Sequence, residues 1–243
     1  MWDPLLRHLE TAGRDVRYDT IGHGESTKPP GPYSLQLYAR QAIELLDHLE
    51  IGSATIIGFS LGGLIAMAIG ALYRDRVDGI AILNAVHRRT PAEQDAVELR
   101  VEQVRGGGPA ATVDAALDRW FTQPFKQDNP ELVEHVRRTI LRNDPEAYLA
   151  AYQVFAQGGV EFHAELDRIS RPALVATGED DIGSTPLMSR RMAAALSGDV
   201  VIWPKLRHLP PMEDPGIVAR TLDVFFRATS ASGEALKASI GNL

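Results

Sequence analysis

The chain has 243 residues, of which 44% are hydrophobic and 23% charged, an ordinary composition that excludes collagen-like, coiled-coil and disordered chains. Its 25 Lys and Arg residues against 32 Asp and Glu residues give a formal net charge of -7, which argues against nucleic acid or an anionic membrane as a partner. Because there is no cysteine, disulfides, thiolate zinc sites and a cysteine nucleophile are excluded.

The hydropathy pattern shows no targeting or membrane segment. Met1-Trp2-Asp3-Pro4 lacks the basic and apolar regions of a signal peptide. No apolar run later in the chain approaches the roughly 20 residues of a membrane span. We therefore expect a cytoplasmic protein without a membrane partner.

The first third of the chain alternates between helix and strand patterns. Asp3 and Pro4 are typical of a helix start. The elements that follow are a strand at 14–19 ending in the turn Gly22-His23-Gly24, a helix with apolar residues from Leu35 to Leu49, a buried strand at 54–58, an apolar helix at 61–72 and a strand at 79–86. This alternation is typical of a parallel sheet covered by helices.

Residues 87–171 instead predict helices without strands. Typical helix starts occur at Thr90-Pro91, Asn129-Pro130 and Asp144-Pro145. Alternation then resumes with a strand at 172–178, a helix from 186, a strand at 199–203 and a helix from 214. We therefore expect one α/β core, residues 1–86 and 172–243, interrupted by a helical cap at 87–171. The small, polar residues at 228–243 predict a flexible tail.

The sequence Gly58-Phe59-Ser60-Leu61-Gly62 lies between the buried strand and the apolar helix. A G-x-S-x-G pattern at such a junction is typical of a nucleophile elbow, a sharp turn that raises a serine above the sheet. The turn leaves little room for Cβ atoms, which explains the flanking glycines, and it aims the N–H of Leu61 at an oxyanion. We predict Ser60 as the nucleophile and Leu61 as an oxyanion donor. The alternative is an ordinary glycine-rich turn.

A serine nucleophile needs a base that accepts its proton. The candidates are His8, His23, His48, His87, His135, His163 and His208. His208 follows the strand that ends at Trp203 and lies in a loop before a helix. A loop at the carboxyl edge of the sheet can reach Ser60. The others lie on predicted helices, in the insertion or near turns. His208 is therefore the predicted base, with a solvated loop histidine as the alternative.

The base in turn needs an anion that fixes its tautomer. Asp180 and Asp181 end the strand 172–178, at the same edge of the sheet. We predict Asp181 as this acid and keep Asp180 as the second candidate, because two adjacent carboxylates cannot both point inward. The alternative is an acidic turn that caps the next helix, although Thr185 would cap that helix better. The order serine, acid, histidine along the chain is that of α/β-hydrolases.

The chain resembles the α/β-hydrolase superfamily over nearly its whole length. The matching segments are DTIGHGES at 19–26, which is similar to the D-x-x-G-x-G-x-S turn, GEDD at 178–181, similar to the G-x-x-D acid loop, and RHLP at 207–210 with EDP at 213–215, similar to the histidine loop. The resemblance implies a mostly parallel sheet flanked by helices, with an all-helical cap inserted after the strand ending near Val86. It also favours Asp181 over Asp180.

Within the superfamily, the insertion resembles the cap of 3-oxoadipate enol-lactonases through residues 104–107 and 119–125. This resemblance implies a small enol-lactone, ester or related carboxylated acyl substrate. The aromatic residues that could then line the pocket are Trp120, Phe121, Phe125, Tyr152 and Phe155. The cationic residues that could bind a substrate carboxylate are Arg88, Arg89 and Arg119. The alternative for each aromatic residue is a place in the core of the cap, and the alternative for each arginine is a place on the solvated surface.

The chain departs from the superfamily at its start. Members begin with a β-hairpin and a strand that ends in His-Gly, followed by a loop with the second oxyanion N–H, and this segment is absent here. The resemblance implies that strands 14–19 and 54–58 lose the partner between them, at about 1–3 kcal/mol for each unpaired backbone group. Loss of the second oxyanion N–H would lower the rate of hydrolysis about 10²–10³-fold. We expect Met1 to be an internal methionine and an N-terminally extended chain to be more stable and active.

Together these features predict a serine hydrolase that cleaves a small ester or lactone through an acyl-enzyme. Carbon–carbon or amide cleavage and perhydrolase activity use the same triad and stay open as alternatives. A weakly active pseudo-enzyme that binds a ligand is the alternative from another class. No nucleotide or metal motif is present, so we expect no cofactor and no metal. The expected partner is a small-molecule substrate, not nucleic acid, and a homo-oligomer stays open.

Overall fold

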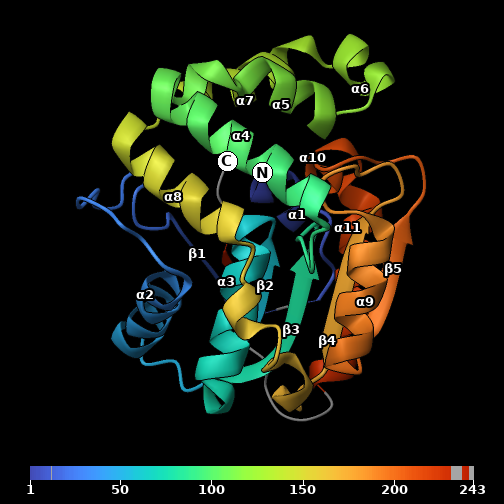
Figure 1. The fold of residues 1–243 in the computed structure, drawn as a ribbon. Helices are drawn as coiled ribbons and strands as arrows, with labels where there is room; N and C mark the ends of the chain where they lie inside the picture. Colours follow the sequence, from blue (N-terminus) through green and yellow to red (C-terminus); the bar gives the residue numbers. More distant parts are fainter. Residues whose placement is uncertain (12, 231–236, 241–243) are drawn as a thin grey trace.

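The computed structural model describes residues 1–11, 13–230 and 237–240. A parallel sheet with the strand order β1-β6-β2-β3-β4-β5 forms its centre (Figure 1). The strands are β1 (Asp15–Tyr18), β2 (Ala54–Phe59), β3 (Val77–Leu83), β4 (Ala173–Gly178), β5 (Asp199–Trp203) and β6 (Lys237–Ile240). This sheet confirms the predicted fold class.

Helices cover both faces of the sheet. The core helices are α1 (Trp2–Leu6), α2 (Leu35–His48), α3 (Leu61–Leu72), α9 (Pro186–Leu196), α10 (Pro210–Glu213) and α11 (Pro215–Ser230). In β3, Ile80 and Ile82 pack in the cluster that contains α2, α3 and α9. Ala81 and Leu83 pack in the cluster that contains α1 and α11. Successive side chains of a strand point to opposite faces, so a strand buried on both faces needs an unbroken apolar run.

Between β3 and β4 the chain forms the predicted helical insertion, which lies above the carboxyl ends of the strands (Figure 1). Its helices are α4 (Pro91–Gly107), α5 (Val113–Trp120), α6 (Gln123–Asp128), α7 (Pro130–Leu141) and α8 (Pro145–Gln157). The side chains of Thr90 and Asp144 cap α4 and α8, as the sequence predicted. Among the described residues, no helix combines the length and apolar character that crossing a membrane requires.

The C-terminal segment forms a strand where the sequence predicted a flexible tail. Residues 228–230 continue α11, and residues 237–240 form β6 between β1 and β2; the other residues of the predicted tail lie outside the described residues. Ala238 pairs with Val16 of β1 on one side and with Ile56 of β2 on the other. The prediction that β1 and β2 lack a partner between them is therefore wrong. A strand is favoured there because unpaired backbone groups along the buried strand β2 cost free energy.

Two histidines pack together where the chain leaves β3 for the insertion. The ring centroids of His87 and His163 lie 4.4 Å apart, and His87 is 1% exposed. Burial, followed by the charge of His163, lowers the pKa of His87 from 6.5 to about 4. His87 therefore stays neutral in the folded protein at pH values where the unfolded chain is already protonated at this position.

Acid should weaken the fold through His87. As the pH falls from about 6.5 toward 4, the unfolded state binds more protons at this group than the folded state, so the free energy of unfolding falls by up to about 1.4 kcal/mol per pH unit. The variant His87→Phe keeps an aromatic ring that does not titrate, and its urea unfolding should depend less on pH in this interval. His48→Gln changes an exposed histidine and serves as the control. Equal pH slopes in wild type and His87→Phe would contradict the prediction.

Candidate active site

Ser60 lies on a tight turn between β2 and α3. Its backbone has φ 53° and ψ -114°, a conformation that residues other than glycine rarely adopt. A Cβ atom at Gly58 would lie 2.0 Å from the carbonyl oxygen of Gly62, so position 58 requires glycine. Leu61 is the first residue of α3, and its N–H therefore has no acceptor within the helix and can bind an anion. This is the strand–turn–helix geometry that the G-x-S-x-G sequence predicted.

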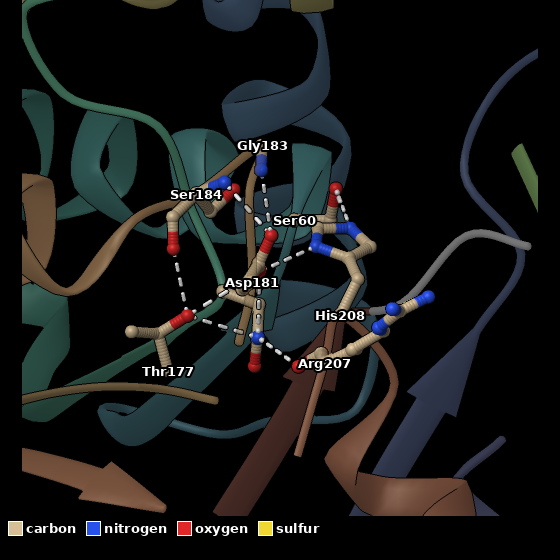
Figure 2. Close-up of polar contacts among 8 residues, drawn as sticks. Ser60, Thr177, Asp181, Gly183, Ser184, Arg207 and His208 are labelled. Atoms are coloured by element: carbon tan, nitrogen blue, oxygen red, sulfur yellow. Dashed lines mark hydrogen bonds and ion pairs between the residues drawn. The ribbon is translucent and has the colours of Figure 1, made fainter. Parts of the chain in front are cut away.

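Ser60, His208 and Asp181 meet at the carboxyl edge of the sheet (Figure 2). The Nε2 atom of His208 lies 3.2 Å from Oγ of Ser60, and its Nδ1 atom lies 2.7 Å from Oδ2 of Asp181. Asp181 follows β4 and His208 follows β5, and parallel strands bring both loops to the same edge. The reserve candidate Asp180 is exposed. If Nδ1–H donates to Asp181, then Nε2 keeps its lone pair for the serine proton.

Asp181 is buried, and both of its oxygens accept hydrogen bonds. Oδ1 accepts from the N–H groups of Gly183 and Ser184, each at 2.9 Å (Figure 2). Oδ2 accepts from Nδ2 of Asn84, also at 2.9 Å. Burial by itself raises the pKa of Asp181. The neighbouring His208 and the hydrogen bonds outweigh burial and hold this pKa below its ordinary value. The site therefore keeps Asp181 as an anion that can orient the imidazole.

The loop that carries His208 is attached to the insertion. The carbonyl oxygen of Trp120, the last residue of α5, accepts a hydrogen bond from the N–H of His208 at 3.0 Å, and the two rings stack 5.9 Å apart. The guanidinium of Arg207 donates to the carbonyl oxygens of Asp118 and Phe121 at 2.7 and 3.1 Å. Carbonyl groups at a helix end have no partner within the helix, so the loop satisfies them. The insertion thus fixes the position of His208.

A cavity of about 140 Å³ opens beside Ser60 and His208, between the sheet and the insertion. Three of the five predicted aromatic residues line it, namely Trp120, Tyr152 and Phe155. Phe121 and Phe125 do not, which corrects the prediction for both. Phe121 is fully buried and stacks on Phe125 with centroids 5.1 Å apart, within the hydrophobic cluster that joins the insertion to the core.

Of the three arginines predicted to bind a carboxylate, only Arg119 lines the cavity. Arg89 donates to the carbonyl oxygens of Ala156 and Phe155 at 2.8 and 3.0 Å, and its guanidinium lies 4.8 Å from the centroid of the Phe155 ring. Arg88 is exposed. Neither Arg88 nor Arg89 lines the cavity: Arg88 takes the solvated alternative, and Arg89 connects the segment after β3 to the end of α8.

Sequence reasoning missed several residues at the site. Arg100 lines the cavity and comes directly before Val101, which forms the buried face of α4 with Val97 and Val104. The spacing of these valines was a usable signal. Asn84 follows β3 with φ 50°, and its amide donates to both Asp181 and Thr177, a contact between segments far apart in the chain. His23 also lines the cavity, and its place in a turn after a parallel strand was a usable signal.

In the described part of the chain, no cluster of three or more His, Asp or Glu residues could hold a metal ion.

Comparisons with known proteins agree with this fold. The model of the alpha/beta hydrolase family matches residues 1–221. 3-Oxoadipate enol-lactonase 2 of Acinetobacter baylyi is 33% identical over 88% of this chain and 79% of its own length. (E)-2-((N-methylformamido)methylene)succinate hydrolase of the same species is 30% identical over 94% of this chain and 86% of its own length.

A solved structure is also similar over most of its length. The enol-lactonase of Burkholderia xenovorans LB400 superposes with a TM-score of 0.85 and 29% identity, covering 93% of this chain and 85% of that one. The parallel sheet and the helical insertion thus belong to a fold shared with that enol-lactonase. The chain belongs to the alpha/beta hydrolase family.

Proposed function

We propose that the protein is a serine hydrolase that cleaves a small ester or lactone through an acyl-enzyme. The observation that carries this proposal is the chain of contacts from Asp181 through His208 to Ser60, at 2.7 and 3.2 Å, beside a cavity. A serine hydroxyl within reach of an imidazole that a carboxylate orients is the arrangement of nucleophilic acyl transfer.

The reaction assigns one task to each group. His208 accepts the hydroxyl proton at Nε2 while Oγ of Ser60 attacks the carbonyl carbon, and the N–H of Leu61 donates to the resulting oxyanion. His208 then gives the proton to the leaving oxygen, which departs as an alcohol or, in a lactone, stays attached to the acyl group. Water attacks the acyl-enzyme with His208 again as the base. The free carboxylic acid and Ser60 are released.

Two further features support a small ester or lactone as the substrate. The cavity of about 140 Å³ is smaller than the ~300–1,000 Å³ typical of drug-sized ligands. One relative reported above is named an enol-lactonase, and the other is named a hydrolase of a substituted succinate. An enol-lactone is an activated ester whose leaving oxygen is a stabilised enolate, so it suits acyl transfer to a serine.

Labelling with a fluorophosphonate probe tests the proposal, because such probes react with activated serines. We expect mass mapping to place the label on Ser60. Ser60→Ala should take up no label, and His208→Ala should take it up much more slowly. Hydrolysis of p-nitrophenyl esters and simple lactones by the wild type gives the matching activity. A folded wild-type protein that is neither labelled nor active would overturn the proposal and favour a ligand-binding role.

A further inference from the structure

The carboxylate of Glu213 binds the insertion shortly after His208 in the chain. Glu213 ends α10, which begins two residues after His208. Its Oε1 atom accepts from the N–H of Thr122 at 2.9 Å, and its Oε2 atom accepts from the hydroxyl of the same residue at 2.7 Å. Glu213 and Thr122 are both half-buried and lie 91 residues apart in the chain. Both oxygens of this carboxylate are thus used in one contact between the core and the insertion.

This contact completes the start of α6 from outside the helix. Thr122 is the N-cap of α6, and its side chain accepts from the N–H of Phe125. In a capping box, the residue three positions after the N-cap supplies a carboxylate to the N–H of the N-cap, as Glu93 does for Thr90 in α4. In α6 this position is Phe125, which has no acceptor in its side chain, and Glu213 supplies the carboxylate instead.

The segment from His208 to Glu213 is therefore attached to the insertion at both ends. At its first end, the N–H groups of His208 and Leu209 donate to the carbonyl oxygen of Trp120 at 3.0 and 3.3 Å. At its second end, Glu213 binds Thr122, two residues further along the insertion. Between the ends, the N–H of Glu213 donates to the carbonyl oxygen of Leu209 at 3.0 Å, which closes one helical turn. Because the segment is this compact, a displacement of either end moves the imidazole.

The contact between His208 and Ser60 leaves little room for such a displacement. Nε2 lies 3.2 Å from Oγ, which is already the long end of the range for a hydrogen bond. A misplacement of about 1 Å can cost a reaction roughly 10²-fold in rate. Glu213 and Thr122 are not among the residues that line the cavity, so they can affect the proton transfer without touching a bound substrate.

We propose that Glu213 is a positioning residue that holds His208 at the distance required for proton transfer from Ser60. The inference rests on the proposed function, because this proton transfer belongs to the proposed reaction. Glu213 does not touch the reacting atoms and acts through its two hydrogen bonds to Thr122. Without these bonds the second end of the segment is free, and the imidazole loses one of the two attachments that set its place.

Two variants separate the contact of Glu213 from its charge. Glu213→Ala removes both hydrogen bonds to Thr122. Glu213→Gln can keep both, because its amide oxygen accepts from the N–H of Thr122 while its NH₂ group donates to the threonine oxygen. Burial raises the pKa of Glu213 although the hydrogen bonds from Thr122 act against it, so the folded state disfavours the charge. The uncharged glutamine avoids this cost and is expected to replace the glutamate.

Steady-state kinetics with a p-nitrophenyl ester tests the role. Glu213→Ala should lower kcat about ten- to hundredfold and change KM by less than about threefold, because the imidazole moves and the cavity lining does not. Glu213→Gln should stay within about threefold of the wild-type kcat. Thr122→Val loses only the hydroxyl contact, and its kcat should fall about three- to tenfold. This variant carries the test if Glu213→Ala does not fold.

The capping box of α4 offers a matched control for the lost hydrogen bonds. Glu93 accepts from the N–H and the hydroxyl of Thr90 at 2.7 and 3.0 Å, which is the same pair of contacts on another N-cap of the insertion. Glu93→Ala should therefore lower the melting temperature about as much as Glu213→Ala does. Because its contact does not involve the His208 segment, Glu93→Ala should keep the wild-type kcat.

A proton NMR signal of the resting protein keeps the role testable even if the hydrolase proposal fails. The Nδ1 proton of His208 in the 2.7 Å contact with Asp181 should give a far-downfield signal that is absent in His208→Ala. Glu213→Ala should broaden or shift this signal, and Glu213→Gln and Glu93→Ala should keep it.

Three outcomes would overturn the role of Glu213. These are a wild-type kcat and NMR signal in both Glu213→Ala and Thr122→Val, a kcat of Glu213→Gln as low as that of the alanine variant, and an equal loss of kcat in Glu93→Ala. A folded wild type that hydrolyses no ester, but whose signal depends on Glu213 as described, would overturn only the proposed function.

Discussion

Replacement of Ser60 or His208 by alanine is expected to lower kcat for a good ester substrate by about 10⁴–10⁶-fold. The reason is that the hydroxyl and the imidazole act as one unit across the 3.2 Å contact between Oγ and Nε2. Without the hydroxyl no acyl-enzyme forms, and without the imidazole the hydroxyl keeps its proton. The double variant should therefore be no slower than the slower single variant, which steady-state kinetics can measure.

The two adjacent aspartates supply a matched control for the same prediction. Asp181→Asn should lower kcat by about 10⁴-fold, because an amide at the 2.7 Å contact favours the wrong tautomer of His208. Asp180→Asn, one residue away and exposed, should keep wild-type activity. Thermal unfolding of each variant separates lost chemistry from lost folding. If Asp180→Asn is the slow variant, the assignment of the acid is wrong.

The second large effect is expected in the sheet. Ser239 lies in the middle of β6, where it pairs with Arg17 of β1 and with Ile57 of β2. Proline at this position removes a backbone donor from a strand with neighbours on both sides, and its ring is found essentially only in edge strands or bulges. We expect Ser239→Pro to lower the free energy of unfolding by about 2–4 kcal/mol. The melting temperature should then fall by roughly 5–15 °C.

Ser239→Ala is the control, because it changes the side chain and keeps the N–H. Its melting temperature should stay close to that of wild type. Activity of Ser239→Pro should fall together with stability, since Ile240 of β6 pairs with Gly58, two residues before Ser60. Identical unfolding curves for the proline and alanine variants would show that β6 does not pair between β1 and β2 in solution.

Much of the candidate site follows from local sequence. The G-x-S-x-G sequence identifies Ser60 because a turn as tight as this one excludes a Cβ atom at Gly58. Asp181 and His208 follow from their places after predicted strands, since parallel strands bring such loops to one edge. Helix start signals predicted the helical insertion as well: the starts at Thr90, Asn129 and Asp144 correspond to α4, α7 and α8, three of its five α-helices. The turn at Ser60 and the helix starts depend on interactions within a few residues of one another.

The lining of the cavity was predicted less well. Trp120 and Phe121 are adjacent in sequence, yet Trp120 lines the cavity and Phe121 is buried in the core. Similarly, Arg89 was a candidate for the cavity and instead donates to two carbonyl groups, whereas Arg100 was not a candidate and lines it. Which face of a helix meets the cavity depends on how the helices of the insertion pack, and composition does not determine that packing.

The amino-acid sequence by itself determined the alternation of strands and helices, the strained turn at Ser60 and the loops that carry Asp181 and His208. Each of these depends on side-chain periodicity or backbone geometry over a short stretch of chain. The tertiary structure alone decided which arginines share the cavity with Ser60 and that residues 237–240 pair between β1 and β2. The pairing of β6 depends on contacts across more than 100 residues, where the cost of unpaired backbone groups selects the partner. The lining of the cavity depends on how the helices of the insertion pack on the core.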